Sequence, residues 1–258
     1  MHPAFAVTRH RPWPVPDRPW IWRQTWHDLL FLHWPIDASA LRSLVPPPLE
    51  INEFAGTAWI AVTPFWISGA TLRAWPDIPG ASKFPELNVR TYVTLDDRPG
   101  VWFLSLDAGS RWAVWAARRL YHLPYVYARM RSHRTGDEVT YQSERPAGPR
   151  FAGRYAPAGP VQHSLPGTIE HFLTERYCLY ARSPSGRLYR GEIHHVPWPL
   201  QTARAVVEQN DLLAAHGLMI TDPPVLMHYA FRLDVVIWPL TRVALGAAAP
   251  RFGAAPTR

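Results

Sequence analysis

Apolar and polar side chains alternate along residues 86–93, and this alternation is the strongest constraint on the fold. Because successive side chains of a strand point to opposite faces of a sheet, it predicts a strand with one apolar and one polar face. The polar face carries an acid, an amide, a guanidinium and a phenol: Glu86, Asn88, Arg90 and Tyr92. That face is either a cavity wall that binds a small polar ligand or a solvated outer face with a Glu–Arg pair, which antiparallel sheets often have.

The rest of the chain predicts many strands and a few short helices. Further strands are predicted at 57–66, 101–107, 125–133, 139–145 and 225–238, with two more around 184–186. Helices are predicted at 37–44 after the N-cap Asp37, at 111–121 after Ser110, at 168–177 and at 201–216, with a long surface loop at 146–166. This order predicts a mainly β fold with a few short helices (α+β), a mostly antiparallel sheet or barrel in one domain.

Composition divides the chain into a body and two ends. Residues 1–19 are Pro-rich and basic, and we expect a flexible leader there. Residues 20–240 carry the aromatic and alternating sequence of a single domain, and the Ala/Gly/Pro/Arg-rich residues 241–258 are expected to be a disordered tail. Thirteen Trp and ten Tyr favour a wide apolar interior or an aromatic-lined pocket in the domain.

Charge and cysteine usage limit the partners. The two ends hold most of the net charge of +7, so the nearly neutral body gives no reason to expect nucleic-acid binding. The single cysteine, Cys178, allows no internal disulfide and no thiolate metal cluster. We recognise neither a signal peptide nor an uninterrupted membrane span, and therefore expect a cytoplasmic protein. The sequence leaves a homo-oligomer open.

Lysine is nearly absent, and this restricts the chemistry. Lys83, the only one, is expected to be a surface amine in a loop, so Schiff-base catalysis is not expected. No helical His-x-x-x-His pair is present, and the rings of His194 and His195 point to opposite faces of one strand, so we expect no metal and no other cofactor. Asp107 could act as a base, bind a ligand or cap a turn. Further ligand-binding candidates share one strand face or lie on the last strand: Tyr125, Tyr127, Arg129 and His228.

Several short segments resemble the YqjF-like family of uncharacterised bacterial proteins. They run from His33-Trp34-Pro35 through residues 84–93 and 103–108 to Thr174-Glu175-Arg176-Tyr177, and end at residues 195–200 and 234–239. That family is similar in fold to acetoacetate decarboxylase. The resemblance implies a closed, mostly antiparallel β cone or barrel with an internal cavity and a few outer helices.

The resemblance also bears on the reaction. The decarboxylase pattern has a Phe-Pro-Lys-Lys segment and a Glu on an earlier strand. Here residues 123–126 read Leu-Pro-Tyr-Val, so Tyr125 and Val126 stand where the pattern has two lysines, and Glu86 matches the Glu. We therefore do not expect a lysine-dependent decarboxylase.

Two functions are compatible with these residues. The first is binding of a small carboxylated or carbonyl-bearing molecule, with Arg90 as the anion anchor, because a guanidinium can hold a carboxylate by two hydrogen bonds. Glu86 would orient the ligand or act as a general base, and Asn88, Tyr92 and Tyr125 would supply hydrogen bonds; lyase or isomerase chemistry on a keto acid would suit this set. The alternative is a non-catalytic small-molecule sensor or protein-interaction module.

Overall fold

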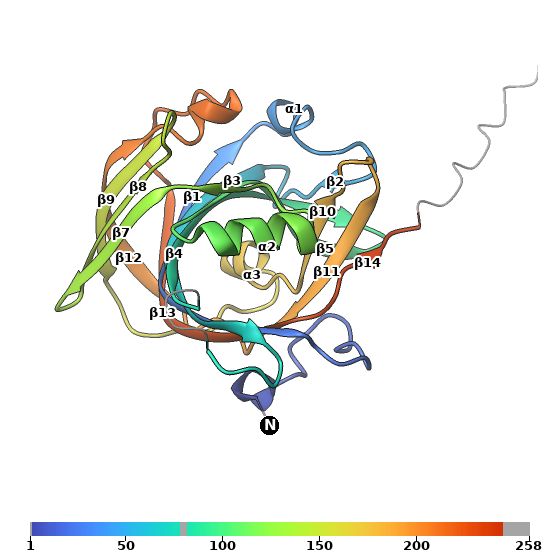
Figure 1. The fold of residues 1–258 in the computed structure, drawn as a ribbon. Coiled ribbons are helices and arrows are strands. Elements are labelled where there is room, and N and C mark those ends of the chain that lie inside the picture. The colour runs from blue at the N-terminus through green and yellow to red at the C-terminus, as the bar shows by residue number, and fades with distance from the viewer. Residues whose placement is uncertain (1, 78–81, 245–258) are drawn as a thin grey trace, which may run out of the picture.

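A computed structural model describes residues 2–77 and 82–244 of the 258-residue chain. Its main feature is a closed ring of strands, because β11 pairs with β10 on one side and with β13 on the other (Figure 1). Around the ring the order is β11 (Leu188–His194), β10 (Cys178–Arg182), β5 (Arg98–Ala108), β4 (Phe84–Leu95), β3 (Ala58–Leu72), β1 (Trp22–Ile36) and β13 (Leu226–Ile237). Neighbours are antiparallel except for β5 and β10, so the prediction of a mainly β, mostly antiparallel fold is confirmed.

A second layer of strands continues from β13 and packs on the outside of the ring (Figure 1). It consists of β12 (Gln201–Asn210), β9 (Arg150–Pro157), β8 (Glu138–Glu144) and β7 (Arg129–Thr135). Its buried side chains reach the ring directly, since the Tyr141 hydroxyl donates to the carbonyls of Phe65 and Glu86. This part of the ring, at β3 and β4, is therefore covered on both faces.

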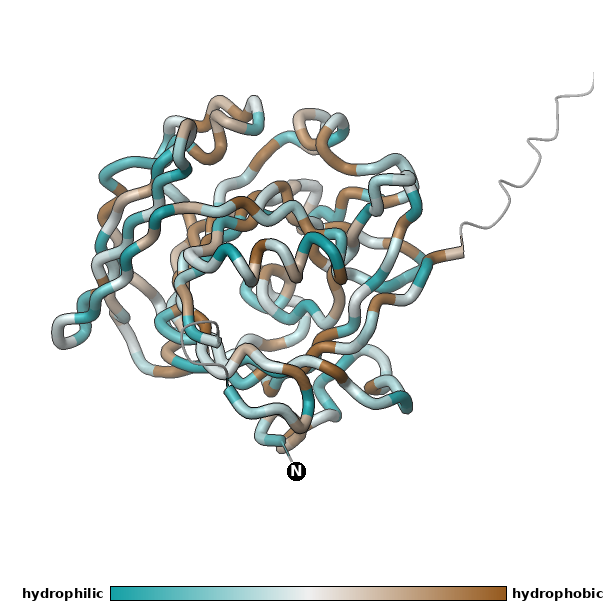
Figure 2. The backbone as a smooth tube through the Cα atoms, viewed as in Figure 1, coloured by the Kyte–Doolittle hydropathy of each residue, from teal (hydrophilic) through white to brown (hydrophobic). Residues whose placement is uncertain are grey.

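The period of two along β1 separates two hydrophobic cores. Leu29 and Phe31 belong to the core inside the ring, whereas Leu30 and Leu32 belong to the core between the ring and the second layer. Figure 2 shows hydrophobic and hydrophilic residues interspersed along these strands. A strand buried on both faces needs this double apolar pattern, and β1, β3 and β4 have it.

Short helices and strands complete the fold: η1 (Pro3–Ala6), α1 (Ala38–Leu41), β2 (Glu50–Ile51), α2 (Arg111–Tyr121), β6 (Tyr125–Tyr127), α3 (Ile169–Thr174), η2 (Ala214–His216) and β14 (Thr241–Arg242). α2 crosses in front of the ring and α3 lies behind it (Figure 1). The predicted caps are confirmed, because Asp37 accepts from the Ser39 amide and Ser110 from the Ala113 amide. No helix in the described ranges has the length and apolar character that crossing a bilayer requires.

Two predicted elements are wrong. Residues 201–216 form β12 and the short η2, not a helix, because β12 pairs with β9 and alternates between exposed and half-buried side chains. Tertiary pairing overrides local helix preference here. Residues 146–166 are not one loop, since they contain β9 with buried Phe151 and Tyr155. Gly153 hides the alternation in the sequence: a Cβ there would lie 2.9 Å from the Val206 carbonyl oxygen, so the site between the two aromatics requires glycine.

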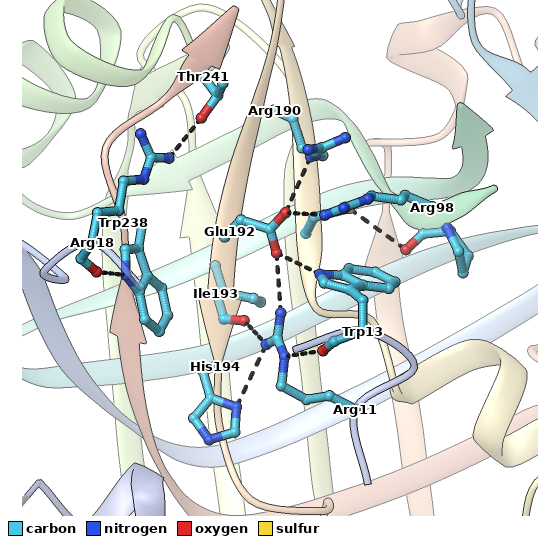
Figure 3. Close-up of polar contacts among 12 residues, drawn as sticks. Arg11, Trp13, Arg18, Arg98, Arg190, Glu192, Ile193, His194, Trp238 and Thr241 are labelled. Carbon is cyan, nitrogen blue, oxygen red and sulfur yellow. Dashed lines mark hydrogen bonds and ion pairs between the residues drawn. The ribbon is translucent and has the colours of Figure 1, made fainter. Parts of the chain in front are cut away.

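The N-terminal segment, for which we expect flexibility, packs against β11. Figure 3 shows Glu192 accepting hydrogen bonds from Arg11 and Trp13 of this segment and from Arg98 and Arg190 of the ring, at 2.8–3.2 Å. Burial lowers the pKa of Arg11, and the nearby Glu192 carboxylate opposes that shift. These contacts give the segment a fixed position that its Pro-rich composition does not predict. The expected tail lies beyond the described residues from 245 on, and its first residues form β14.

Candidate functional site

A pocket of about 130 Å³ lies inside the ring. Side chains of all seven ring strands, of β6 and α2, and of the segments next to them line it, and most of them are apolar. The aromatic residues among them are Trp22, Trp26, Phe65, Phe84, Phe103, Trp112, Tyr121, Tyr125 and Trp198. A largely apolar pocket with a few convergent polar groups is the usual form of a small-molecule site.

The polar face of β4 points into this pocket. Glu86, Asn88 and Arg90 all line it and all are buried. The alternation places them at successive inward positions of the strand, with about 7 Å between neighbours. Of the two interpretations of this face, the geometry therefore agrees with the cavity wall and not with a solvated outer face.

Glu86 and Tyr125 form a hydrogen-bonded pair at the pocket wall. The Tyr125 hydroxyl donates to Oε2 of Glu86 at 2.7 Å. Burial raises the pKa of Glu86 to about 8, although hydrogen bonds from Tyr125 and Asn88 act in the opposite direction. A carboxyl group with a pKa near neutrality can both accept and return a proton, which is what general acid–base catalysis needs.

Two guanidinium groups lie deeper in the pocket without a carboxylate partner. Among the described residues, no ion pair involves Arg90 or Arg176. Their Nε and Nη2 atoms, respectively, are buried without a hydrogen-bond partner in the described structure, as is Oδ1 of Asn88. Burial lowers the pKa of Arg176 to about 10, which leaves it charged at neutral pH. Because buried charges are normally paired, the two cations create a strong preference for an anion.

Tyr92 holds these guanidinium groups in place. Its ring lies 5.9 Å from the Arg90 guanidinium carbon and 5.1 Å from that of Arg176, within the range of cation–π contact. Its hydroxyl is 2.7 Å from Nε2 of His33. His228 lies beside His33, and burial lowers the pKa of both imidazoles. Tyr92 and His228 do not line the pocket themselves. They lie behind Arg90 and Arg176, at what we call the polar end of the pocket.

Comparison with known proteins places the chain in a family. The model of DUF2071, described as an uncharacterized conserved protein, matches residues 23–234. The chain belongs to the DUF2071 family. It is 46% identical over 230 residues to the uncharacterized protein YqjF of Bacillus subtilis, with 88% of this chain and 95% of that protein covered. The resemblance found in the sequence is confirmed.

Solved structures similar to this DUF2071 chain show the fold. The enduracididine biosynthesis enzyme MppR, complexed with pyruvate, matches with a TM-score of 0.63 and 12% identity, covering 90% of this chain and 96% of that one. Acetoacetate decarboxylase from Legionella pneumophila matches at 0.61 and 14% over 95% and 96% of the two chains. An acetoacetate decarboxylase-like enzyme from Sphingomonas wittichii matches at 0.63 and 15%, over 92% and 99%. At these identities the likeness concerns the fold alone.

Besides Tyr92 and His228, three further predicted ligand-binding residues of the DUF2071 chain lie outside the pocket. The pairing of β4 with β5 shifts register between Val89 and Arg90, and as a result both Phe103 and Leu106 face the pocket. Asp107, the residue after Leu106, therefore points to the core between the ring and the second layer. There Asp107 accepts from Arg145 at 2.7–2.8 Å. Tyr127 and Arg129 do not line the pocket either: the Tyr127 ring centre lies 4.0 Å from the Arg111 guanidinium carbon, and the exposed Arg129 pairs with Glu144.

Replacing Asp107 with alanine is expected to lower the free energy of unfolding by about 3 to 5 kcal/mol, because it leaves the largely buried Arg145 without its counter-charge. The affinity of the pocket for ligands is expected to stay unchanged. Urea denaturation measures the first quantity. Glu144→Ala removes two solvent-accessible ion pairs, with Arg129 and with Arg150, and should cost only about 1 kcal/mol, which makes it the control. Equal effects of the two variants would contradict this assignment.

The sequence analysis missed polar residues that come from outside β4. Arg176, Thr174 and His195 line the pocket together with Trp198. Arg176 lies in a segment that carried the family resemblance, but the sequence analysis put it inside a helix predicted at 168–177. The helix α3 in fact ends at Thr174, so Arg176 follows it. Of the two adjacent histidines, His195 lines the pocket, whereas the His194 ring stacks on His10 and does not line it. Burial lowers the pKa of His195 to about 3, so this imidazole is neutral.

Lys83 lies outside the pocket of the DUF2071 chain. Its ammonium nitrogen is 4.7 Å from the Trp66 ring, and Lys83 is exposed. It is therefore not placed to form an imine with a ligand in the ring. Within the described ranges, no group of three His, Cys, Asp or Glu side chains is arranged to hold a metal ion.

Proposed function

We propose that this protein binds a small carboxylated, carbonyl-bearing molecule in the pocket of the ring. The observation that carries the proposal is the pair of buried guanidinium groups, Arg90 and Arg176, which have no carboxylate partner among the described residues. A ligand carboxylate would offset one of these two positive charges and accept hydrogen bonds from Arg90 Nε and Arg176 Nη2. Charge-assisted hydrogen bonds of this kind are about twice as strong as neutral ones.

Glu86 suits proton transfer next to the ligand carbonyl. It lies on the same strand face as Arg90, with Asn88 between them. When its carboxylate removes a proton from the carbon beside the carbonyl, the C–H bond breaks and an O–H bond forms on Glu86. The electron pair moves onto the carbonyl oxygen, where the Asn88 amide and the guanidinium groups can stabilise it. Return of the proton to a different position gives isomerase chemistry.

The similar structures support this proposal at the level of the ligand class. One of them is described as complexed with pyruvate, a small keto acid. The proposed chemistry does not pass through an imine, because Lys83 does not line the pocket. Tyr125, at a lysine position of the decarboxylase pattern, donates a hydrogen bond to Glu86. Acid–base chemistry on the free carbonyl is therefore the reaction class that these side chains favour.

Deuterium exchange tests the catalytic part. In heavy water the protein is expected to accelerate loss of the C3 proton signal of 2-oxobutanoate, followed by nuclear magnetic resonance. Glu86→Gln keeps the side-chain size but cannot take up the proton, and should lose about 100-fold or more of this rate. Binding of the keto acid without faster exchange would favour the second function, a non-catalytic sensor of small acids.

Binding itself is tested by a matched pair of ligands. We expect calorimetry to detect a 2-oxo acid but not its methyl ester, which has nearly the same shape and lacks the negative charge. Equal affinity for acid and ester would contradict the role of the two guanidinium groups.

A further inference from the structure

The polar side chains of β4 that line the pocket lie at increasing distances from α2. Glu86 pairs with Ala108 at the end of β5, and α2 begins at Arg111 just beyond it. Arg90 pairs with Phe103, further from α2 along the same two strands. Going inward from α2, the polar groups of β4 therefore come in the order carboxyl, amide, guanidinium.

Side chains from the opposite direction back the guanidinium end. The guanidinium carbon of Arg176 lies 4.3 Å from the ring centre of Phe172 on α3, and its Nη1 donates to Asn52 at 2.8 Å. The Tyr92 ring beneath both guanidinium groups has no exposed surface. These side chains close the pocket beyond the two guanidinium groups. The rest of a molecule whose carboxylate binds here must therefore extend toward α2.

The side chains that α2 itself contributes to the pocket are mostly apolar. The residues of α2 that line it are Trp112, Ala113, Ala116, Ala117, Leu120 and Tyr121. Spacings of three and four put the first five on one helical face, whereas the arginines of α2 do not line the pocket. Trp112 and Leu120 are also 46% and 57% exposed, so this end of the pocket reaches the surface.

We propose that the ligand is an amphipathic acid, with its carboxylate on Arg90 and Arg176 and an apolar tail that packs against α2. This inference rests on the proposed function and adds the substrate class. The carbonyl would lie near Asn88 and the adjacent carbon near Glu86, which places the reacting atoms between the charged head and the tail.

The size of the pocket agrees with a substantial tail. An apolar cavity of about 150 Å³ is large enough to bind benzene. The pocket of about 130 Å³ is similar in size and has many aromatic side chains in its wall. Pyruvate would fill only its polar end and leave the pocket-facing surface of Trp112 and Leu120 on α2 exposed to water.

A chain-length series tests this inference by calorimetry on the full chain. The probes are pyruvate, 2-oxobutanoate, 2-oxohexanoate and 2-oxooctanoate, with phenylpyruvate as an aromatic tail. We expect affinity to rise by about fourfold for each buried methylene, because each contributes about 0.8 kcal/mol of hydrophobic transfer free energy. Because the α2 end reaches the surface, the longest acid is expected to bind without a steric penalty.

Two tryptophans of α2 provide a matched pair of variants. Trp112→Ala is expected to weaken binding of 2-oxooctanoate about tenfold and to leave pyruvate binding unchanged. Trp115→Ala removes a tryptophan that is 62% exposed and does not line the pocket, and should change neither affinity. Circular dichroism and thermal unfolding of both variants show that they are folded.

The outcomes separate this inference from the proposed function. Rising affinity along the series, together with the loss in Trp112→Ala alone, supports the amphipathic ligand. Equal affinity for pyruvate and the long acids, or equal effects of the two tryptophan variants, would overturn it while the proposed binding of small acids stands. If none of the acids binds, the proposed function fails, and this inference fails with it.

Discussion

Replacing Arg90 with alanine is expected to abolish binding of keto acids while the fold stays intact. Removing one partner of a buried charge pair costs about 2 to 5 kcal/mol in binding, which corresponds to a loss of roughly 30-fold to several thousand-fold. Calorimetry against a panel of keto acids measures this loss. Arg204→Ala is the control, because Arg204 is exposed on β12, far from the ring interior.

The stability of the same variant provides a second, opposite readout. Within the described residues, Arg90 has no ion pair, and its Nε has no hydrogen-bond partner. A buried unpaired charge is a cost to folding, so Arg90→Ala is expected to keep or raise the melting temperature. A residue that costs stability yet is needed for binding is typical of a functional site. Unchanged binding, or a large fall in stability, would reject Arg90 as the anion anchor.

Arg176 extends this test to the polar end as a whole. Both guanidinium groups face the same Tyr92 ring, so their effects on binding should not be additive. The double variant Arg90→Ala/Arg176→Gln is expected to bind the ligand as well as the single variant with the lower affinity does. The reason is that one missing contact already leaves the ligand carboxylate mispositioned. Fully additive losses would indicate two independent contacts.

Local periodicity explains why part of the site could be predicted. Glu86, Asn88 and Arg90 lie on one strand, and the period of two alone puts them on one face. Tyr125, which the family resemblance put at a lysine position of the decarboxylase pattern, joins them through its hydrogen bond with Glu86. What a single strand contributes to a site is therefore readable from sequence.

Features that depend on other strands could not be predicted in this way. The register shift opposite Arg90 turns Asp107 away from the pocket, and a bulge of this kind leaves no mark in the alternation of β4. Likewise β12 has a helix-like composition and becomes a strand only because β9 pairs with it. Arg176 reaches the pocket after α3, so its role depends on closure of the whole ring.

The buried carboxyl of Glu86 is expected to make stability depend strongly on pH. Its pKa is about 8 in the folded protein and about 4.5 in the unfolded chain, because burial disfavours the charged form. Between these values the folded state holds one more proton than the unfolded state, so the free energy of unfolding falls as pH rises. The slope from this group is about 1.4 kcal/mol per pH unit. Stability is therefore full below about pH 4.5 and lost progressively up to pH 8.

Glu86→Gln isolates this contribution. The variant keeps an amide that can accept the Tyr125 hydrogen bond but does not titrate. Urea denaturation of both proteins from pH 5 to pH 9 gives the difference in free energy of unfolding, in which the titration of other buried groups cancels. The difference is expected to change by roughly 4 kcal/mol in favour of the variant by pH 8 and then to stay constant. The same proton equilibrium governs the proposed chemistry, because only the ionised carboxylate can remove a proton from the ligand. A flat difference across this range would mean that Glu86 is already ionised at neutral pH, and would remove the group on which both the pH dependence and the acid–base role depend.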